Sequence, residues 1–332
     1  MLPIIDMNIV NDQTGRYVRT HNTPIKQVEE ELTKLYGGWR TVLCNSGQEA
    51  IVTLLDILQP DVVIVDDETY FETRDWLHYK NINTVQLKDA GQLSDLEIVL
   101  AASKGTVLVI IDNPTTFAKW YNVQTLADTI HRYGGILAVD NSIVSLHYSN
   151  PIKNGADVCI ESYTKYVCGY GDVMAGGLCF ADTMQWLEQK PVPLTNPGQD
   201  NLSWIIAHRG NCVSPDKAYM VSRGLQTLAC RMIMHTDGAA YIYDKLKEAG
   251  VDCLWPGCGG LITLPGKTEE FCKRLKQFKT VGTFGCTYSI ADFFRSKERY
   301  TQGFCARLSV GLENPRDLWR DVKQALDLNK EE

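Results

Sequence analysis

The stretch Val139–Leu178, VDNSIVSLHYSNPIKNGADVCIESYTKYVCGYGDVMAGGL, decides the fold and contains the residue with the clearest chemical role. Inside it, the apolar, strand-like run Val158–Ile160 leads into Ser162, Thr164 and Lys165. A lysine that leaves a buried strand is desolvated, which lowers the pKa of its amine and makes it a nucleophile. Taken alone, the segment is explained more simply by a surface lysine at a strand end, so the rest of the chain has to decide.

Outward from this stretch, apolar runs typical of strands alternate with segments of helical spacing. Glu49–Leu58 and Val123–Tyr133 carry apolar residues at the period of a helix. The strand-like runs are Arg40–Cys44, Val62–Val65, Val107–Ile111, Ile136–Val139, Val158–Ile160 and Gly177–Phe180. Short strands rich in β-branched residues that alternate with helices predict an α/β fold, with a mostly parallel central sheet covered on both faces.

These patterns divide the chain into four predicted parts. Residues 1–35 form an N-terminal arm, 36–215 a large α/β domain, 216–248 a linking helix and 249–332 a smaller C-terminal α+β domain. The elements expected in the small domain are strands near Leu261–Leu264 and Arg307–Val310 and helices near Lys267–Phe278 and Pro315–Leu326. The proline-rich segment Lys190–Pro197 predicts a loop, and the acidic segment Gln27–Lys34 predicts a solvated helix face.

The composition excludes several classes of partner. The 332 residues are 44% hydrophobic and carry a formal net charge of −7, which disfavours nucleic acid as a partner because proteins that bind it usually present a basic stripe. No apolar run approaches the length of a membrane span, and the first residues do not resemble a signal peptide. The 11 cysteines form no CxxC pair, and the scattered histidines lack metal-ligand spacing. We therefore expect a cytoplasmic protein with reduced thiols and without a metal site.

Polar residues follow several of the predicted strands. Ser46, Gly47 and Gln48 come after the first strand and enter a helix, where exposed backbone N–H groups can bind an anion. An ordinary helix cap by Ser46 is the simpler alternative. Asp140 ends the strand before Lys165. Because ligands of doubly wound sheets bind beyond the carboxyl ends of the strands, we expect these groups to converge.

Together these groups match the needs of pyridoxal phosphate. This cofactor takes a lysine for its aldehyde, a carboxylate against its pyridine nitrogen, an anion pocket for its phosphate and, commonly, an aromatic ring over its face. The residues expected in these roles are Lys165, Asp140, the phosphate ligands Ser46, Gly47, Gln48, Ser162 and Thr164, and the stacking ring Tyr70.

At this point the sequence resembles the pyridoxal-phosphate-dependent cysteine/methionine metabolism family, which includes cystathionine γ-synthase, the cystathionine lyases and methionine γ-lyase. Val139–Leu178 is similar to that family's VDN…P…GAD…S-x-TKY…G-x-x-D-V-x-AG signature, with Lys165 at the Schiff-base position. YVRTHNTP at Tyr17–Pro24 is similar to the YSRxxNPT segment. The resemblance implies that Tyr17 and Arg19 reach the cofactor phosphate of a neighbouring subunit, and hence a homodimer or a pair of dimers.

Three further motifs extend the resemblance along the chain. Ser46-Gly47-Gln48 is similar to the family's SGM phosphate turn, and Ser222–Leu228 is similar to its RGLKTL helix. Ala306–Glu313 is similar to its xRLSVGLE strand, which implies that Arg307 binds the α-carboxylate of the substrate. The implied fold is that of a type I pyridoxal-phosphate enzyme, like aspartate aminotransferase.

The sequence departs from the family on the substrate side. The family's YGGT turn reads Tyr70-Phe71-Glu72-Thr73, with both glycines replaced. Asn113 and Thr115 both compete for the position that faces the ring hydroxyl. The SxGG turn at the substrate appears as Thr283-Phe284-Gly285-Cys286, so Thr283 is the expected substrate contact there.

The resemblance implies β- or γ-elimination on an amino acid, most simply cleavage of a carbon–sulfur bond in a small sulfur amino acid. Two alternatives stay open. One is a γ-replacement transferase that acts on an activated homoserine, in primary or specialised metabolism. The other is a scaffold that binds the cofactor without catalysis, which the presence of Lys165, Asp140 and Arg307 together argues against.

Overall fold

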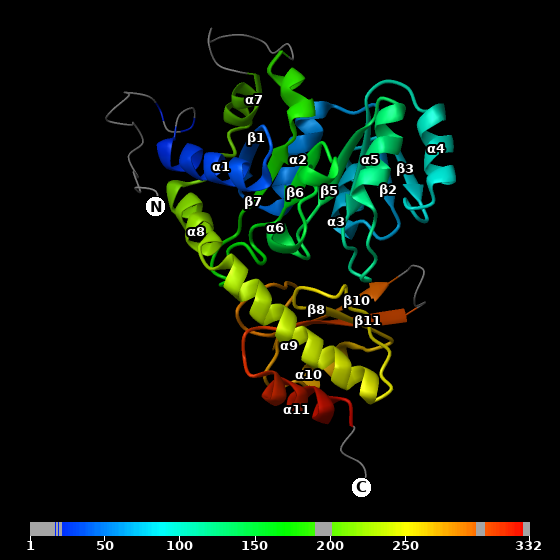
Figure 1. Ribbon diagram of the computed structural model, residues 1–332, viewed down its shortest axis with the longest axis vertical. Coiled ribbons are helices and arrows are strands. Elements are labelled where there is room, and N and C mark those ends of the chain that lie inside the picture. The colour runs from blue at the N-terminus through cyan, green and yellow to red at the C-terminus, as the bar shows by residue number, and fades with distance from the viewer. Residues whose placement is uncertain (1–16, 18, 20–21, 190–200, 297–302, 328–332) are drawn as a thin grey trace.

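The computed structural model describes residues 17, 19, 22–189, 201–296 and 303–327, apart from the side chains of 201, 203, 295, 296 and 303. The proline-rich segment Lys190–Pro197 lies outside these residues. Figure 1 shows a larger unit built on one sheet and a smaller unit beside it, connected by the long helix α9 (Leu228–Glu248).

A seven-stranded sheet forms the centre of the larger unit. Its order is β1-β7-β6-β5-β4-β2-β3, and among these strands only β7 runs antiparallel to its neighbours. The strands are β1 (Arg40–Cys44), β2 (Val62–Asp66), β3 (Thr84–Leu87), β4 (Val107–Asp112), β5 (Ile136–Asp140), β6 (Val158–Glu161) and β7 (Gly176–Phe180). The prediction of an α/β fold with a mostly parallel sheet is confirmed.

Successive residues of the central strands pack into different cores. In β4, Leu108 and Ile110 contact the cluster that includes α2 (Gly47–Leu58), whereas Val109 and Ile111 contact the cluster that includes α4 (Leu93–Ala102) and α5 (Val123–Arg132). The remaining helices of this unit are α1 (Thr23–Tyr36), α3 (Phe71–Tyr79), α6 (Ser145–Tyr148) and α7 (Asn201–Arg209), with the 3₁₀ turns Ile152–Asn154 and Asp182–Gln189. Apolar side chains on both faces explain why these strands read as continuous apolar runs.

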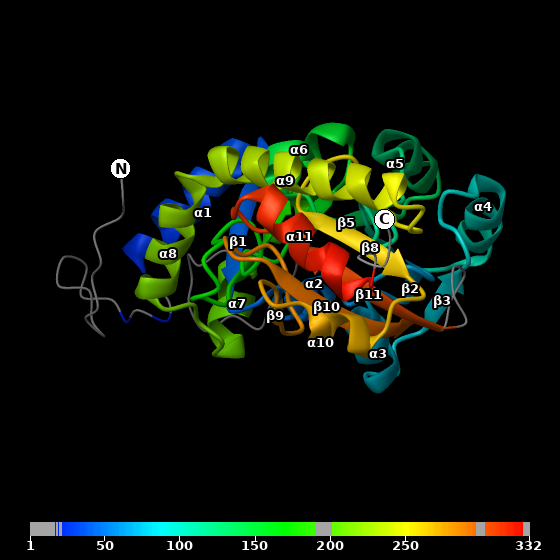
Figure 2. The same cartoon turned by 90° about the horizontal axis from the view of Figure 1, so that it is seen from below.

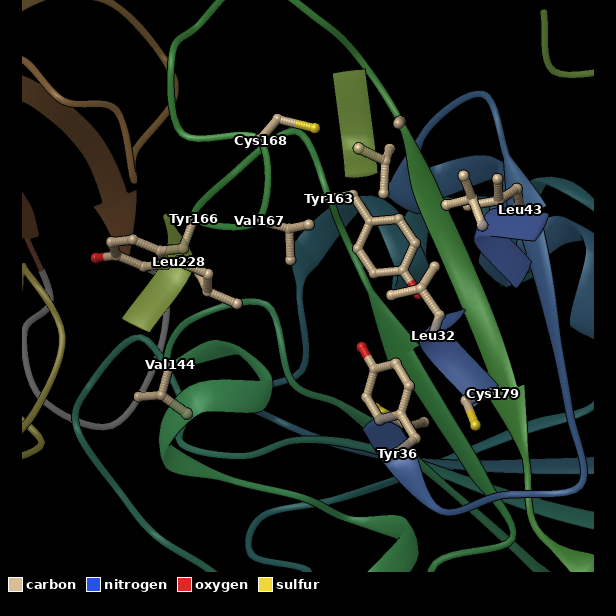
Figure 3. Close-up of a cluster of buried hydrophobic side chains, with 14 of the residues drawn as sticks. Leu32, Tyr36, Leu43, Val144, Tyr163, Tyr166, Val167, Cys168, Cys179 and Leu228 are labelled. Atoms are coloured by element: carbon tan, nitrogen blue, oxygen red, sulfur yellow. The ribbon is translucent and has the colours of Figure 1, made fainter. Parts of the chain in front are cut away.

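A third core lies beside the loop that contains Lys165. Tyr36 of α1 and Tyr163 lie in this cluster, and Figure 3 shows their hydroxyl ends pointing toward one another. Tyr166 and Val167, which follow the lysine, belong to the same cluster. Packing on both sides of Lys165 therefore fixes the course of this loop.

Helix α1 corrects the prediction of an arm that extends to residue 35. Val28, Leu32 and Tyr36 are buried, and Glu29 accepts a hydrogen bond from the backbone amide of Leu43 in β1 at 2.9 Å. Thr23–Tyr36 thus packs on the chain's own sheet. The expectation of a solvated face for Gln27–Lys34 holds only for the side of the helix opposite these buried residues.

The predicted linking helix is two helices, α8 (Pro215–Leu225) and α9. The carbonyl of Gly224 accepts from the guanidinium of Arg231 at 2.8 Å, so a side chain from the second helix satisfies the end of the first. A Cβ at Gly224 would lie 2.2 Å from the carbonyl oxygen of Val167, so the glycine lets α8 approach the lysine loop.

A four-stranded sheet of order β8-β11-β10-β9 forms the smaller unit. Its elements are β8 (Leu261–Pro265), α10 (Glu269–Arg274), β9 (Lys279–Thr280), β10 (Ile290–Ser296), β11 (Gly303–Ser309) and α11 (Pro315–Ala325). Figure 2 shows α11 lying across this sheet beside α9. The helix predicted over Lys267–Phe278 is shorter, because the amides of Lys276 and Gln277 turn away to donate to the Asp321 carboxylate. In the described part of the chain, no helix is both long and apolar enough to cross a membrane.

Candidate active site

The carboxyl ends of the large sheet carry the predicted site residues. Ser46 follows β1, Lys165 follows β6, Asp140 ends β5 and Tyr70 follows β2. In the strand order these residues come from one continuous stretch of the sheet, between β1 and β2. Arg307 comes from β11 of the small sheet, and its charge acts on both Lys165 and Tyr70. The site thus lies where the two units meet.

The turn after β1 forms the first wall of the site. Ser46 caps α2 by accepting a hydrogen bond from the Glu49 amide at 3.0 Å, so the simpler cap explanation holds for this hydroxyl. A Cβ at Gly47 would lie 2.7 Å from the Cβ of Ser162, and one at Gly176 would lie 2.4 Å from the carbonyl oxygen of Ser46. Two glycines therefore let the start of α2 approach Ser162 across β7.

A short relay of hydrogen bonds connects Ser162 to Asp140. The Ser162 amide donates to the Ser142 hydroxyl at 2.8 Å, and the Ser142 amide donates to an Asp140 carboxylate oxygen at 2.9 Å. Burial raises the pKa of Asp140, while Ser142 and the charge of Lys165 oppose that shift. The carboxylate is thus held in a fixed direction in a desolvated place.

Three other residues predicted to contact the cofactor, Thr164, Asn113 and Thr115, already make hydrogen bonds within the protein. The hydroxyl of Thr164 donates to the carbonyl of Ala175 and accepts from its amide, both at 3.0 Å. Asn113 is buried and accepts from the Tyr121 amide through its side-chain oxygen at 2.8 Å. The hydroxyl of Thr115 donates to Glu68 at 2.5 Å. This bond of Asn113 thus uses only its side-chain oxygen, whereas the Thr115 hydroxyl already donates its one proton to Glu68.

Lys165 lies between the two units. Its amine donates to the Thr283 hydroxyl at 2.9 Å and lies 4.7 Å from the centre of the Phe284 ring. Burial, and after it the charge of Arg307, lowers the pKa of the amine to about 8. At pH 7 about a tenth of an amine with this pKa is neutral, far more than for an ordinary lysine, and that form can act as a nucleophile or base.

Tyr70 and Asp112 form the far wall. The Tyr70 amide donates to the Asp112 carboxylate at 3.1 Å. Burial and a hydrogen bond to Glu72 raise the pKa of the Tyr70 hydroxyl, and the charges of Arg307 and Asp140 also act on it. Asp112 pairs in register with Asp140, and burial together with the Asp140 charge raises its pKa well above the usual value.

Asp112 is a site residue that was not predicted from the sequence. Its signal in the sequence is the same as that of Asp140, a carboxylate at the end of an apolar run.

Arg307 is oriented by its surroundings in the small unit. It donates through Nη2 to Asp292 of β10 at 2.8 Å, and its guanidinium carbon lies 5.2 Å from the Phe284 ring centre. Its Nε is buried and, within the described part of the chain, has no hydrogen-bond partner. Such an atom is a ready donor for a carboxylate.

Arg19 and Tyr17 lie beside α7. Arg19 donates to the carbonyl of Ala207 in α7 at 2.6 Å, and its guanidinium carbon lies 5.6 Å from the centre of the exposed Tyr17 ring. Within one chain these two residues are therefore held by α7 and by each other.

The residues present fit pyridoxal phosphate. Lys165 supplies an amine of lowered pKa, and Asp140 supplies a fixed carboxylate. Gly47 leaves the turn after β1 without a side chain, where a Cβ would clash with Ser162. Gln48 has a buried side-chain oxygen without a hydrogen-bond partner among the described residues, and an amide can turn to present its NH₂ group to an anion. Among the described residues, no three His, Cys, Asp or Glu side chains gather as metal ligands.

Comparisons with known proteins identify the family of the chain. Residues 6–253 match the model of the family described as Cys/Met metabolism PLP-dependent enzyme. The chain is 29% identical to a cystathionine gamma-synthase of Haemophilus influenzae, over 95% of this chain and 88% of that protein. It is 28% identical to a cystathionine gamma-lyase of Bos taurus, over 93% of this chain and 83% of that protein.

Solved structures show the same fold. The structure of apo CalE6, a methionine gamma lyase from Micromonospora echinospora, superposes with a TM-score of 0.84 at 23% identity and covers 98% of this chain and 93% of that one. A cystathionine gamma-lyase from Lactobacillus plantarum complexed with L-serine gives 0.84 at 22% identity, again over 98% and 93%.

Proposed function

The chain belongs to the Cys/Met metabolism PLP-dependent enzyme family, and from that premise we propose that it cleaves a carbon–sulfur bond of a small sulfur amino acid by β- or γ-elimination. The observation that carries this proposal is the meeting of Lys165, Asp140 and Arg307 at the junction of the two units. An amine, a carboxylate and a guanidinium in these places serve proton transfer, cofactor binding and recognition of a substrate carboxylate, respectively.

The amides at Ser46–Gln48 and the Ser162 side chain would hold the phosphate group of the cofactor. Asp140 would hold a proton at the pyridine nitrogen, and Tyr70 would cover the ring face. When bound, pyridoxal phosphate supplies an electron sink for the pair left behind when a bond at the substrate Cα breaks.

The chain's own residues would then carry the remaining steps. Arg307 binds the substrate α-carboxylate through Nε, since Asp292 occupies Nη2. The neutral amine of Lys165 takes the proton from Cα and returns it later, while Thr283 keeps that amine directed into the site. Loss of the leaving thiol and hydrolysis yield a thiol, ammonia and a keto acid.

Replacement is the second candidate, because the chain is also similar to a cystathionine gamma-synthase over nearly its whole length. The same residues can serve an incoming thiol once a leaving group has departed from Cγ. The two reactions differ in whether a nucleophile is consumed, so the products distinguish them.

We propose a homodimer as the smallest active unit, with Tyr17 and Arg19 near the phosphate of the neighbouring subunit. The resemblance of Tyr17–Pro24 to the family segment supports this arrangement, as does the exposure of the Tyr17 ring in the single chain. We also propose a cytoplasmic location, since all 11 cysteines are free thiols.

The test is incubation of the cofactor-loaded protein with cystathionine, methionine, homocysteine, cysteine and O-acyl-homoserines, with and without added thiol. Elimination predicts release of a keto acid and a thiol from a sulfur substrate without any added nucleophile. Formation of a new thioether only when thiol is present would favour replacement. No turnover of any amino acid by the loaded protein would contradict both reactions and leave the non-catalytic scaffold.

A further inference from the structure

Asp292 and Arg307 form an ion pair inside the candidate site. They face each other in register on the antiparallel strands β10 and β11, with 2.8 Å between Oδ2 and Nη2. Their side chains are 20% and 15% exposed, respectively, so the pair is mostly shielded from water. A shielded ion pair keeps much of its electrostatic strength.

Asp292 is held independently of Arg307. Its second carboxylate oxygen accepts a hydrogen bond from the amide of Phe293 at 2.8 Å. The guanidinium carbon of Arg307 also lies 5.7 Å from the Phe294 ring centre, in addition to its contact with Phe284. The strand backbone thus fixes the carboxylate, and the carboxylate and two rings fix the guanidinium.

The pairing limits what Arg307 can offer to an anion. Nη2 is already bonded, and the negative charge of Asp292 offsets the positive charge of Arg307 at short range. A plain carboxylate would therefore gain little attraction here. An amino acid differs, because its amino group adds a second anchor at the cofactor.

We propose that Asp292 positions Arg307 and weakens its hold on a carboxylate, so that an acid without an amino group binds poorly and productive binding depends on the second anchor that an amino acid has. The proposal rests on the proposed function, because it needs Arg307 to bind the substrate carboxylate.

A second consequence concerns Lys165. The charge of Arg307 lowers the pKa of the Lys165 amine, and the groups that oppose it are Cys286, Asp140 of β5 and Glu72 of α3. Removing the Asp292 charge leaves Arg307 uncompensated. The pKa of the lysine nitrogen should therefore fall further, which gives a readout independent of turnover.

The experiment compares the cofactor-loaded protein with the variants Asp292→Asn and Asp292→Ser. The probe is propionate, a carboxylic acid without an amine, and its dissociation constant is measured by calorimetry. In parallel, the cofactor absorbance is titrated with pH. We expect both variants to bind propionate about tenfold more tightly and to show a lower pH midpoint.

Asp317→Asn is the matched control. Asp317 pairs with Arg320 on the exposed face of α11 at 2.6 Å, so this variant removes the same charge away from the site. It should leave both readouts unchanged, whereas Asp292→Glu should keep them near those of the parent protein. If one neutral variant fails to fold, judged by circular dichroism, the other decides.

Two results overturn separate claims. Unchanged propionate affinity and pH midpoint in a folded neutral variant would overturn the role of Asp292. Tighter propionate binding that survives the additional change Arg307→Ala would instead show that the anion binds elsewhere, and would overturn both the carboxylate role of Arg307 and the inference built on it.

Discussion

At the scale of single residues, Glu161 is a buried carboxyl group close to the site, and its pKa differs clearly from the ordinary value. It accepts a hydrogen bond from the Tyr36 hydroxyl in the core, and burial raises its pKa from 4.5 to about 7. Asp140 lies close enough to add to that shift. Glu161 directly precedes Ser162, so its ionisation affects the segment that leads to the phosphate turn and the lysine.

The raised pKa predicts a pH-dependent stability. Between pH 4.5 and 7 the folded state binds more protons than the unfolded state, so the free energy of unfolding should fall as the pH rises, by about 3 kcal/mol in total. Glu161→Gln keeps an acceptor for Tyr36 but cannot ionise. We expect the stability of the variant relative to the parent to improve by about 2 to 3 kcal/mol between pH 5 and pH 8.

Denaturant unfolding at the two pH values measures this difference. Glu188→Gln in the 3₁₀ turn Asp182–Gln189 is a suitable exposed control, for which the relative stability should be nearly the same at both. An equal offset between Glu161→Gln and the parent at pH 5 and pH 8 would show that Glu161 does not titrate in this range.

At the residue scale, the sequence singles out side chains that follow an apolar run. Asp140 and Lys165 stand out because such runs are buried and their ends expose chemistry. Arg231 and Asp292 gave no such signal. An arginine in a helix and an aspartate in a strand usually face water, and only tertiary contacts shield these two: Arg231 is buried, and Asp292 pairs with Arg307.

At the scale of elements, glycines let the start of α2 approach the loop after β6. Gly176→Ala would place a Cβ 2.4 Å from the carbonyl oxygen of Ser46 and so push the phosphate turn outward. Overpacking of this kind typically costs about 1 to 3 kcal/mol. We expect at least a tenfold loss of affinity for pyridoxal phosphate (about 1.4 kcal/mol), measured by equilibrium titration of the cofactor-free protein.

The control is Gly135→Ala, which creates a clash of 2.8 Å with Ile130 just before β5, at the end of that strand far from the site. This variant should lose stability but keep its cofactor affinity once folded. Equal cofactor affinity in Gly176→Ala and in the parent would contradict the steric role of the glycine.

Helix α9 fixes the loop after Lys165 through one side chain. Arg231 donates to the carbonyls of Tyr166 at 2.6 Å, Val167 at 2.9 Å and Gly224 at 2.8 Å, and it is buried. Arg231→Met keeps much of the volume but leaves three buried acceptors without this donor. We expect a loss of about 3 kcal/mol in the free energy of unfolding, measured by denaturant titration.

Arg320 on the exposed face of α11 provides the control variant. Arg320→Met should change the free energy of unfolding by less than about 0.5 kcal/mol, because Arg320 pairs only at the surface. A similarly small change for Arg231→Met would mean that the loop is held by other contacts.

The elements predicted from sequence were those with strong apolar periodicity. Strand β3 was missed because its residues, TVQL, are mostly not buried at the edge of the sheet. Strand β10 was missed because IADFFRS interrupts its apolar residues with Asp292 and Arg295. The break between α8 and α9 was missed because both halves have helical spacing, and the contact of Arg231 with Gly224 is a tertiary one.

At the scale of the whole molecule, the proposed dimer makes a specific prediction. If Arg19 serves the site of the neighbouring subunit, Arg19→Ala and Lys165→Ala each inactivate the homodimer. A heterodimer of the two variants carries one fully intact site. Equal mixing after dissociation and reassociation should restore roughly a quarter of the parent activity, since half the dimers are mixed and each has one good site.

Activity assays before and after mixing measure this recovery, and Lys165→Ala mixed with Asp140→Ala is the control. Those two residues lie in the same chain's site, so both sites of a mixed dimer are defective and no activity should return. If the Arg19 mixture, like the control, recovers no activity, Arg19 acts within its own chain, where it contacts Ala207.

The central claim is that Lys165 carries the cofactor. The direct measurement is reduction of the loaded protein with borohydride, followed by digestion and mass spectrometry of the peptides, with the absorbance band at roughly 420 nm recorded beforehand. We expect the added mass of the reduced cofactor on the peptide that contains Lys165, and its loss in Lys165→Ala. A label on another lysine, or an undiminished label in Lys165→Ala, would contradict the claim.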